Sequence, residues 1–221
     1  MREILGTVFC VSYHRAEYVE ECLKSYRNNI FSHKLKLVFI DNGSKENKKC
    51  IFDRYAIEGD VFERFDENNP IGRSNYAVNK YGEGEAYTIL MDDDMLPFNG
   101  LEKRIKPIID GRCQVVYTSL KNIGDEIGVK SRQKLLDKNR IVFGTMAYTP
   151  EAYNKVEGLN ELLRYQCDYL FIELLRLNYD ILYVSDVTLL YRYHTEAEST
   201  TQTKECRAKE HEIVKKILGS I

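Results

Sequence analysis

Short apolar runs alternate with helical patterns along the chain, and this alternation limits the folds that the sequence can adopt. The first two apolar runs cover residues 6–12 and 35–40, and a helical pattern follows each of them. A strand, a helix and a second strand in this order normally form a parallel pair with a crossover helix. A length of 221 residues suits one domain. The sequence therefore predicts a single α/β domain with a mostly parallel central sheet flanked by helices.

The later segments continue the same order. We expect further strands at residues 61–65, 87–91, 115–117, 141–148 and 181–184. We expect helices at residues 17–27, 48–55, 73–81, 97–109, 168–177 and 204–218. Residues 121–140 are polar and charged without a clean period, which predicts a mobile loop or a lid on the acceptor side.

Three consecutive carboxylates, Asp92, Asp93 and Asp94, follow the apolar run at residues 87–91 directly. Side chains alternate along a strand, so we expect Asp92 and Asp94 on one side and Asp93 on the other. Two carboxylates aimed at one space repel each other unless a cation lies between them, and Mg²⁺ or Mn²⁺ prefers such oxygen ligands. A solvated acidic turn or a helix cap is the alternative. The position favours a ligand site, because open α/β sheets bind ligands at the carboxyl ends of their strands.

Composition excludes several classes of protein. The formal net charge is −2, so the whole chain carries no basic signature of tight nucleic-acid binding, and nucleic acid is an unlikely partner. No apolar stretch approaches the roughly 20 residues of a membrane span, and the first residues lack a signal-peptide pattern. The six cysteines are scattered without a Cys-x-x-Cys pair, which predicts reduced thiols and a cytoplasmic protein.

Six segments, in order, resemble the motifs of the family-2 glycosyltransferases, which use nucleotide-diphospho-sugars and have the GT-A fold. They span residues 7 to about 200, and their combination is more specific than any one of them. The segments are residues 7–15, 37–44, 69–75, 90–97, 156–161 and 191–194. The resemblance implies a Rossmann-like GT-A domain with a small acceptor-side subregion.

The resemblance implies a nucleotide-binding role for the first two strand ends. In the family, the exit of strand one and the aspartate that ends strand two hold the uracil and ribose of the donor. Here these are Ser12, Tyr13, Arg15 and Asp41, which meet at one edge of the predicted sheet. Asp41 also suits plain turn chemistry, because Asp-Asn-Gly forms turns readily. Both interpretations of Asp41 stay open.

The segment 69–75 adds Gly72, Arg73 and Asn75 to the expected donor-binding residues. Gly72 would allow close approach of the backbone. Arg73 could contact the base or the diphosphate through its planar guanidinium, although an exposed arginine at a helix start is the commoner case. Asn75 belongs to the Asn- and Gly-rich helix start that precedes the acidic strand in the family.

A divalent metal, Mn²⁺ or Mg²⁺, is the cofactor that the resemblance implies. Asp92 then contacts the ribose or the metal, Asp94 binds the metal directly, and diphosphate oxygens complete the coordination. His194 would lie near the metal and the diphosphate, as the histidine of "Y-R-x-H" does in the family. Without the resemblance, a lone histidine is more often structural. Asp93 either faces away or assists donor binding.

Transfer with inversion needs a carboxylate that takes the proton of the acceptor hydroxyl. The family has this base in an "E-D" pair at the start of a helix, and the corresponding residue here is Asp168, with Cys167 in place of the glutamate. Asp168 also suits the N-cap of that helix, so its catalytic and structural interpretations both stay open. Glu161 is the second candidate for the base.

These features predict an inverting, metal-dependent glycosyltransferase. It would move a sugar from a nucleotide-diphosphate donor, most simply a UDP-sugar, to a hydroxyl of a glycan, a lipid-linked intermediate or a small molecule. Residues 1–98 would form the nucleotide-sugar half, residues 99–203 the acceptor half, and residues 204–221 a C-terminal helix.

Three alternatives remain from the residues alone. The same chemistry could act on a nucleic-acid base or a protein, although the acidic chain disfavours nucleic acid. A nucleotidyltransferase would normally carry a glycine-rich phosphate loop after strand one, and residues 12–17 contain no glycine. A non-catalytic binding relic is the third alternative, and the retained carboxylates and His194 argue against it.

Overall fold

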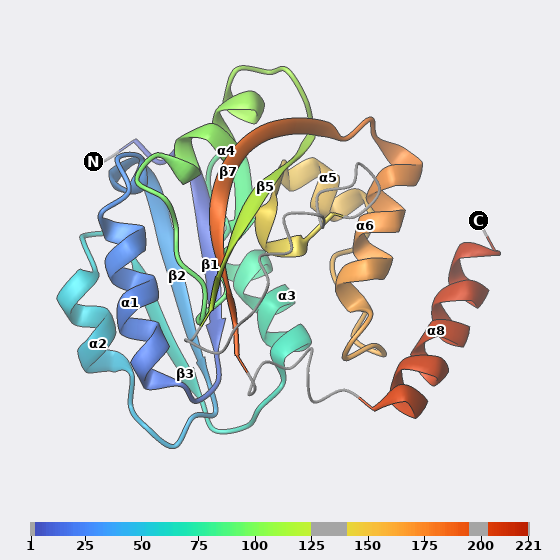
Figure 1. Cartoon of the computed structure of the whole chain (residues 1–221), viewed down its shortest axis with the longest axis horizontal. Coiled ribbons are helices and arrows are strands. Elements are labelled where there is room, and N and C mark those ends of the chain that lie inside the picture. Colours follow the sequence, from blue (N-terminus) through green and yellow to red (C-terminus); the bar gives the residue numbers. More distant parts are fainter. Residues whose placement is uncertain (1–2, 125–140, 195–202, 221) are drawn as a thin grey trace.

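Within residues 3–124, 141–194 and 203–220, which this computed structural model describes, seven strands form one sheet (Figure 1). Their order across the sheet is β3-β2-β1-β4-β6-β5-β7. β1 pairs in parallel with β2 and β4, β2 with β3, and β5 with β7, whereas β6 runs antiparallel to β4 and β5. The strands are β1 (Gly6–Ser12), β2 (Leu35–Asn42), β3 (Val61–Phe65), β4 (Ala86–Ile89), β5 (Val115–Gly124), β6 (Met146–Tyr148) and β7 (Leu182–Tyr193). The predicted α/β domain with a mostly parallel sheet is confirmed.

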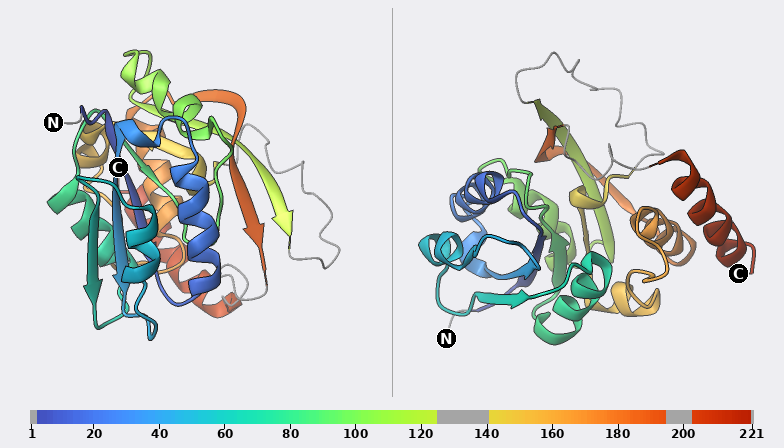
Figure 2. Two further views of the ribbon diagram at one scale, coloured as in Figure 1. Left: turned by 90° about the vertical axis from the view of Figure 1, so that its left-hand side faces the viewer. Right: turned by 90° about the horizontal axis from the view of Figure 1, so that it is seen from below.

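Helices cover both faces of this sheet (Figures 1 and 2). The helices are α1 (Ala16–Arg27), α2 (Lys49–Tyr55), α3 (Pro70–Tyr81), α4 (Gly100–Ile109), α5 (Pro150–Lys155), α6 (Cys167–Asn178) and α8 (Lys204–Leu218). One apolar core joins the sheet to α1, α2 and α4, and a second joins its other face to α3, α5 and α6. None of the helices in the described part of the chain is long and apolar enough to cross a membrane.

The strand order reverses between β1 and β4, so the sheet has a topological switch point between these two strands. β2 and β3 follow β1 on one side, while β4 begins the series on the other side. The parallel register pairs Ser12 with Asp41 and Phe9 with Ile89, so the carboxyl ends of β1, β2 and β4 lie at one edge. In open α/β sheets, the crevice at such a switch point is where ligands bind.

Several predicted boundaries are wrong, and tertiary pairing explains the differences. β4 ends at Ile89, before the predicted Met91. β5 and β7 are longer than predicted because they pair with each other along almost their whole length. Only residues 146–148 of the predicted strand 141–148 are extended, after a 3-10 turn, η3 (Phe143–Thr145). Lys121–Gly124 belong to β5, and the rest of the predicted lid, residues 125–140, lies outside the described residues.

A fully buried arginine, Arg104 of α4, joins the two halves of the sheet. It donates hydrogen bonds to the hydroxyl oxygens of Thr88 on β4 (3.1 Å) and Thr188 on β7 (3.0 Å), and to the carbonyl of Thr188 (2.8 Å). Burial lowers the pKa of Arg104 to about 9, although the negative charge of Asp94 opposes this shift. The guanidinium therefore stays protonated at neutral pH. A buried charge with this many partners fixes β4 relative to β7.

We expect Arg104→Met to lower the free energy of unfolding by about 3 kcal/mol, because it leaves two hydroxyls and the charge of Asp94 without their buried partner. Urea unfolding measures the change. The matched control is Arg112→Met. The exposed side chain of Arg112 lies 4.0 Å from Asp110, so its replacement should change the free energy of unfolding by less than about 0.5 kcal/mol. Equal stability of the two variants would contradict the structural role of Arg104.

Candidate active site

The three carboxylates lie in a turn, residues 92–94, which we call the acidic turn. The Leu90 amide still bonds to the carbonyl of Phe9 (2.9 Å), but the carbonyl of Met91 accepts the amide of Asp94 (3.2 Å) and the thiol of Cys22 (3.3 Å). The backbone therefore leaves the sheet before Asp92. The predicted placement of Asp92 and Asp94 on one side is wrong, because the alternation of a strand ends with β4.

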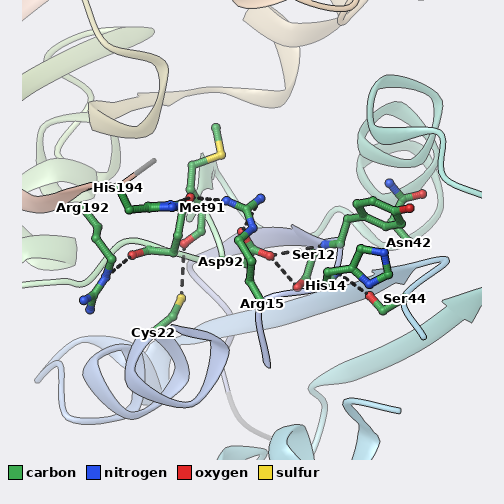
Figure 3. A network of polar contacts seen from close by, with 12 residues as sticks. Ser12, His14, Arg15, Cys22, Asn42, Ser44, Met91, Asp92, Arg192 and His194 are labelled. Carbon is green, nitrogen blue, oxygen red and sulfur yellow. Dashed lines mark hydrogen bonds and ion pairs between the residues drawn. The ribbon is translucent and has the colours of Figure 1, made fainter. Parts of the chain in front are cut away.

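Asp92 faces the exit of β1. Its Oδ2 accepts hydrogen bonds from the Ser12 hydroxyl (2.7 Å) and the Tyr13 amide (3.3 Å) (Figure 3). The buried ammonium of Lys48 donates to the same Ser12 hydroxyl (2.6 Å). Burial raises the pKa of Asp92, and the charges of Arg15 and Lys48 oppose the shift. Burial lowers the pKa of Lys48, and the negative charges of Asp92 and Asp41 oppose this shift.

Arg15 bridges two carboxylates of the acidic turn. Its guanidinium lies 2.5 Å from Asp93 Oδ2 and 3.4 Å from Asp92 Oδ1. His14 and Arg15 both have a φ of 57°, in the left-handed region that non-glycine residues seldom adopt. This reversal of the backbone brings the arginine back over the acidic turn. Arg15 is therefore held beside the negative charge at some conformational cost.

Asp93 pairs with His194, which follows the end of β7. The distance between His194 Nε2 and Asp93 Oδ2 is 3.1 Å, and the ring of Tyr18 lies 4.9 Å from the imidazole ring. His194 is buried, and its Nδ1 has no hydrogen-bond partner among the described residues. The sequence left the role of Asp93 open, and it is this carboxylate that the structure brings to His194.

Asp94 faces β7. Its Oδ1 accepts the amide of Arg192 (2.8 Å), and its buried Oδ2 has no hydrogen-bond partner among the described residues. Burial, followed by the charge of Asp93, raises the pKa of Asp94 well above its usual range. Asp94 thus links the acidic turn to the strand that carries His194.

Arg192 holds the acidic turn from the opposite side to Arg15 (Figure 3). Its Nε donates to the carbonyl of Asp93 (2.9 Å), its guanidinium pairs with Glu21 of α1, and its Cζ lies 4.8 Å from the ring centre of Tyr18. α1, the acidic turn and β7 are therefore joined through one side chain.

The edge of the sheet beside the acidic turn continues from β1 to β2, where Ser12 pairs with Asp41. Asp41 is fully buried, and its Oδ1 accepts the amide of Ser44 (3.3 Å), which is the turn contact that its sequence context suggested. Its Oδ2 lies 3.7 Å from Arg64 Nε but has no hydrogen bond among the described residues. Asp41 combines a turn-forming oxygen with a second oxygen that lacks a hydrogen bond.

The expected residues at the start of α3 differ in their surroundings. Asn69 caps the helix by accepting the Gly72 amide (3.1 Å), and a Cβ on Gly72 would lie 2.4 Å from the Asn69 side chain. The absence of a side chain at Gly72 thus lets its backbone lie close to the capping side chain of Asn69. Arg73 packs on Phe65 with its Cζ 3.7 Å from the ring centre. The side chain of Asn75 is saturated by four contacts, to Tyr153, Glu161 and both backbone groups of Leu159.

The two candidate bases, Glu161 and Asp168, follow α5 in the chain. Asp168 is in the first turn of α6, where its Oδ1 accepts the amide of Tyr169 (2.7 Å). Burial raises the pKa of Asp168, and the negative charge of Glu210 raises it further. Glu161 is exposed and bonds to Asn75 (3.1 Å). The side-chain hydrogen bond of Asp168 lies within α6, whereas Glu161 contacts Asn75 of α3.

Sequence reasoning missed Lys48 and Glu21 and gave Arg192 no separate role. Lys48 lies in a run of polar residues that resembles an exposed loop, and only the tertiary fold buries it. Glu21 is one of several carboxylates on α1. The one available signal was the arginine of the "Y-R-x-H" segment, which precedes His194 by two residues.

The comparison with protein families agrees with this geometry. The family model for glycosyl transferase family 2 matches residues 7–172. The chain belongs to glycosyl transferase family 2, as its motifs predict. No curated protein sequence matches the chain.

Solved structures with the same fold include S. aureus TarS 1–349 in complex with UDP-GlcNAc, with 19% identity and a TM-score of 0.75. That match covers 92% of this chain and 61% of TarS 1–349. The UDP complex of the same fragment has 20% identity and a TM-score of 0.71 over 89% and 62% of the two chains. Mannosyltransferase PcManGT from Pyrobaculum calidifontis, in complex with GDP-Man and Mn²⁺, has 14% identity and a TM-score of 0.66 over 89% and 59%. The chain thus spans less than two thirds of these proteins.

Two potential metal ligands, a carboxylate and an imidazole, meet at the acidic turn. Within the described residues, no group of three or more His, Cys, Asp or Glu side chains is arranged to hold a metal by itself. Asp93 and His194 provide one carboxylate and one imidazole in contact with each other. A cation bound there would need further oxygen ligands, which phosphates or water can supply.

Because Arg15 bridges Asp92 and Asp93, we expect it to compete with a divalent cation for these carboxylates. Arg15→Gln should bind Mn²⁺ several-fold more tightly in the absence of any nucleotide, since a competing positive charge is removed. Calorimetric titration with Mn²⁺ measures the affinity. Arg54→Gln, at an exposed pair with Glu20, is the control and should leave it unchanged. Weaker Mn²⁺ binding by Arg15→Gln would contradict the competition.

Proposed function

We propose that this member of glycosyl transferase family 2 transfers a sugar, with inversion, from a nucleotide-diphosphate donor to an acceptor hydroxyl. The observation that carries the proposal is the acidic turn at the β1–β4 switch point, where Arg15 and His194 meet Asp93. A carboxylate, a histidine and an arginine together suit a diphosphate and a cation.

The donor class is supported by the proteins with the same fold. TarS was solved with UDP and with UDP-GlcNAc, and PcManGT with GDP-Man and Mn²⁺. A nucleotide-diphospho-sugar is therefore the donor that we propose here, with a UDP-sugar as the first candidate. Asp41, Ser12 and Tyr13 would receive the base and ribose, because they lie at the ends of β2 and β1 beside the acidic turn.

We assign the metal to Asp93 and His194, with Mn²⁺ or Mg²⁺ as the ion. This revises the expectation that Asp94 binds it, since Asp94 is buried and accepts the Arg192 amide. Such an ion would stabilise the negative charge of the departing nucleoside diphosphate, so no acid is needed there. Arg15 would move from the carboxylates to the diphosphate oxygens, which are the stronger partners for a guanidinium fork.

Asp168 is the base that we propose. As a general base it accepts the proton of the acceptor hydroxyl while the oxygen attacks the anomeric carbon, and it must be ionised to do so. Its pKa is raised, chiefly by burial. Activity should therefore decline, as the pH falls, at a higher pH than for an ordinary aspartate. Glu161 is the second candidate.

The acceptor that we propose is a glycan, a lipid-linked intermediate or a small molecule, bound by the half of the domain from residue 99 to residue 203. Residues 1–98 would bind the donor, and residues 204–221 form the C-terminal helix. A cytoplasmic location is part of the proposal. All six cysteines, each within the described residues, are free thiols, which suits a reducing compartment.

We expect Asp168→Asn to lower turnover by roughly 10²–10⁴-fold while donor affinity stays within about twofold, because the amide cannot accept the proton. Release of nucleoside diphosphate from UDP-GlcNAc and GDP-mannose with Mn²⁺ measures turnover, and calorimetry measures donor binding. Glu161→Gln is the control and should keep most of the activity. Full turnover by Asp168→Asn and loss in Glu161→Gln would transfer the role to Glu161.

A further inference from the structure

The segment that leads into α6 is held by a residue from another helix. Gln166, the residue before α6, makes no side-chain capping bond of its own. Instead, the carboxylate of Glu210 on α8 accepts three consecutive backbone amides, from Arg164 (2.9 Å), Tyr165 (2.8 Å) and Gln166 (2.8 Å). Charge-assisted bonds of this kind are stronger than neutral ones, and a helix N-terminus favours negative charge.

Two further contacts hold α8 at the same place. The side-chain amide of Gln166 donates to the carbonyl of Arg207 (2.7 Å), and His211 Nδ1 lies 3.4 Å from Gln166 Oε1. Val214 of α8 is buried in a small apolar cluster with Leu163, Cys167 and Leu170. Polar and apolar contacts therefore both join α8 to the first turn of α6.

Asp168 lies two residues beyond the last amide that Glu210 accepts. The direction of its side chain depends on the backbone of this first turn, because its own bonds are local. Three residues of α8 contact the segment before Asp168: Glu210 through its carboxylate, Arg207 through its carbonyl and His211 through its ring. Of these, Glu210 acts on the pKa of Asp168 and raises it.

We propose that Glu210 is a positioning residue for Asp168, and that α8 is therefore part of the catalytic unit. Its carboxylate fixes the backbone of residues 164–166 and thereby the direction of the Asp168 carboxylate. This inference rests on the proposed function, since it concerns the base of that reaction. Glu210 itself need not touch the donor or the acceptor.

The test compares the whole chain with Glu210→Gln and with Glu212→Gln. Glu212 lies on the same helix but is exposed and pairs with Lys215, so it is a matched control. Amide exchange followed by mass spectrometry reports on residues 164–166. Titration of the Asp168 carboxyl by ¹³C NMR, assigned with Asp168→Asn, reports its pKa without any substrate.

We expect Glu210→Gln to speed amide exchange at residues 164–166 roughly tenfold and leave exchange in β1 and β2 unchanged, because the charged acceptor is lost. The pKa of Asp168 should fall, because a nearby negative charge is removed. Turnover of the donor should drop while its KM stays constant, and the acid limb of the pH profile should move to lower pH. Glu212→Gln should match the wild type in every measurement.

Wild-type exchange at residues 164–166 and an unchanged pKa of Asp168 in Glu210→Gln would overturn the proposal. Faster exchange with an unchanged pH profile would also overturn it, because that result describes a merely structural cap. If Glu210→Gln unfolds, Glu210→Asp is measured instead. It keeps the negative charge, so the pKa of Asp168 should stay raised while amide exchange at residues 164–166 becomes faster. Failure of the proposed base is a separate result, since Asp168→Asn would then keep its turnover whatever the exchange data show.

Discussion

The burial of Asp92 and Asp94 on either side of a third carboxylate, Asp93, is the constraint that the surrounding structure has to offset. Burial and the negative charge of Asp93 both raise the pKa values of Asp92 and Asp94. Cations and donors from four separate elements offset that cost: Arg15 after β1, Lys48 before α2, Arg104 on α4 and Arg192 on β7. The fold brings these elements together at one switch point. The acidic turn is thus held at the sheet edge by partners from several elements.

The three carboxylates of the acidic turn contact different parts of the structure. Asp92 joins the exit of β1, Asp94 joins the backbone of β7, and Asp93 pairs with Arg15 and His194. Two of the three carboxylates are therefore tied to strands. Asp93 is the one whose partners are a histidine and an arginine, and it is there that we propose the cation binds. In our proposal, Asp168 of α6, positioned by Glu210 of α8, supplies the base for the same reaction.

The sequence predicted the sheet edge well and the details of the acidic turn poorly, for physical reasons. Strands β1 and β2 are buried apolar runs, so their patterns and the joint position of Ser12 and Asp41 could be predicted. The apolar run before Asp92 continues to Met91, so nothing in it marks the end of β4 at Ile89. The burial of Lys48 and the reach of Glu210 to α6 depend on tertiary contacts. Local sequence carries no signal for either.

The central claim is that Asp93 and His194 hold a divalent cation for a nucleoside diphosphate. The most direct test is calorimetric titration of UDP and of GDP, with and without Mn²⁺. It compares the wild type with Asp93→Asn and with His33→Gln. His33→Gln is the control, at a histidine of the short turn η1 (Ser32–Lys34). The account predicts that Mn²⁺ strengthens binding of at least one nucleotide in the wild type and in His33→Gln, and that Asp93→Asn loses this gain. Equal strengthening by Mn²⁺ in Asp93→Asn, or no effect of Mn²⁺ on the wild type, would contradict it.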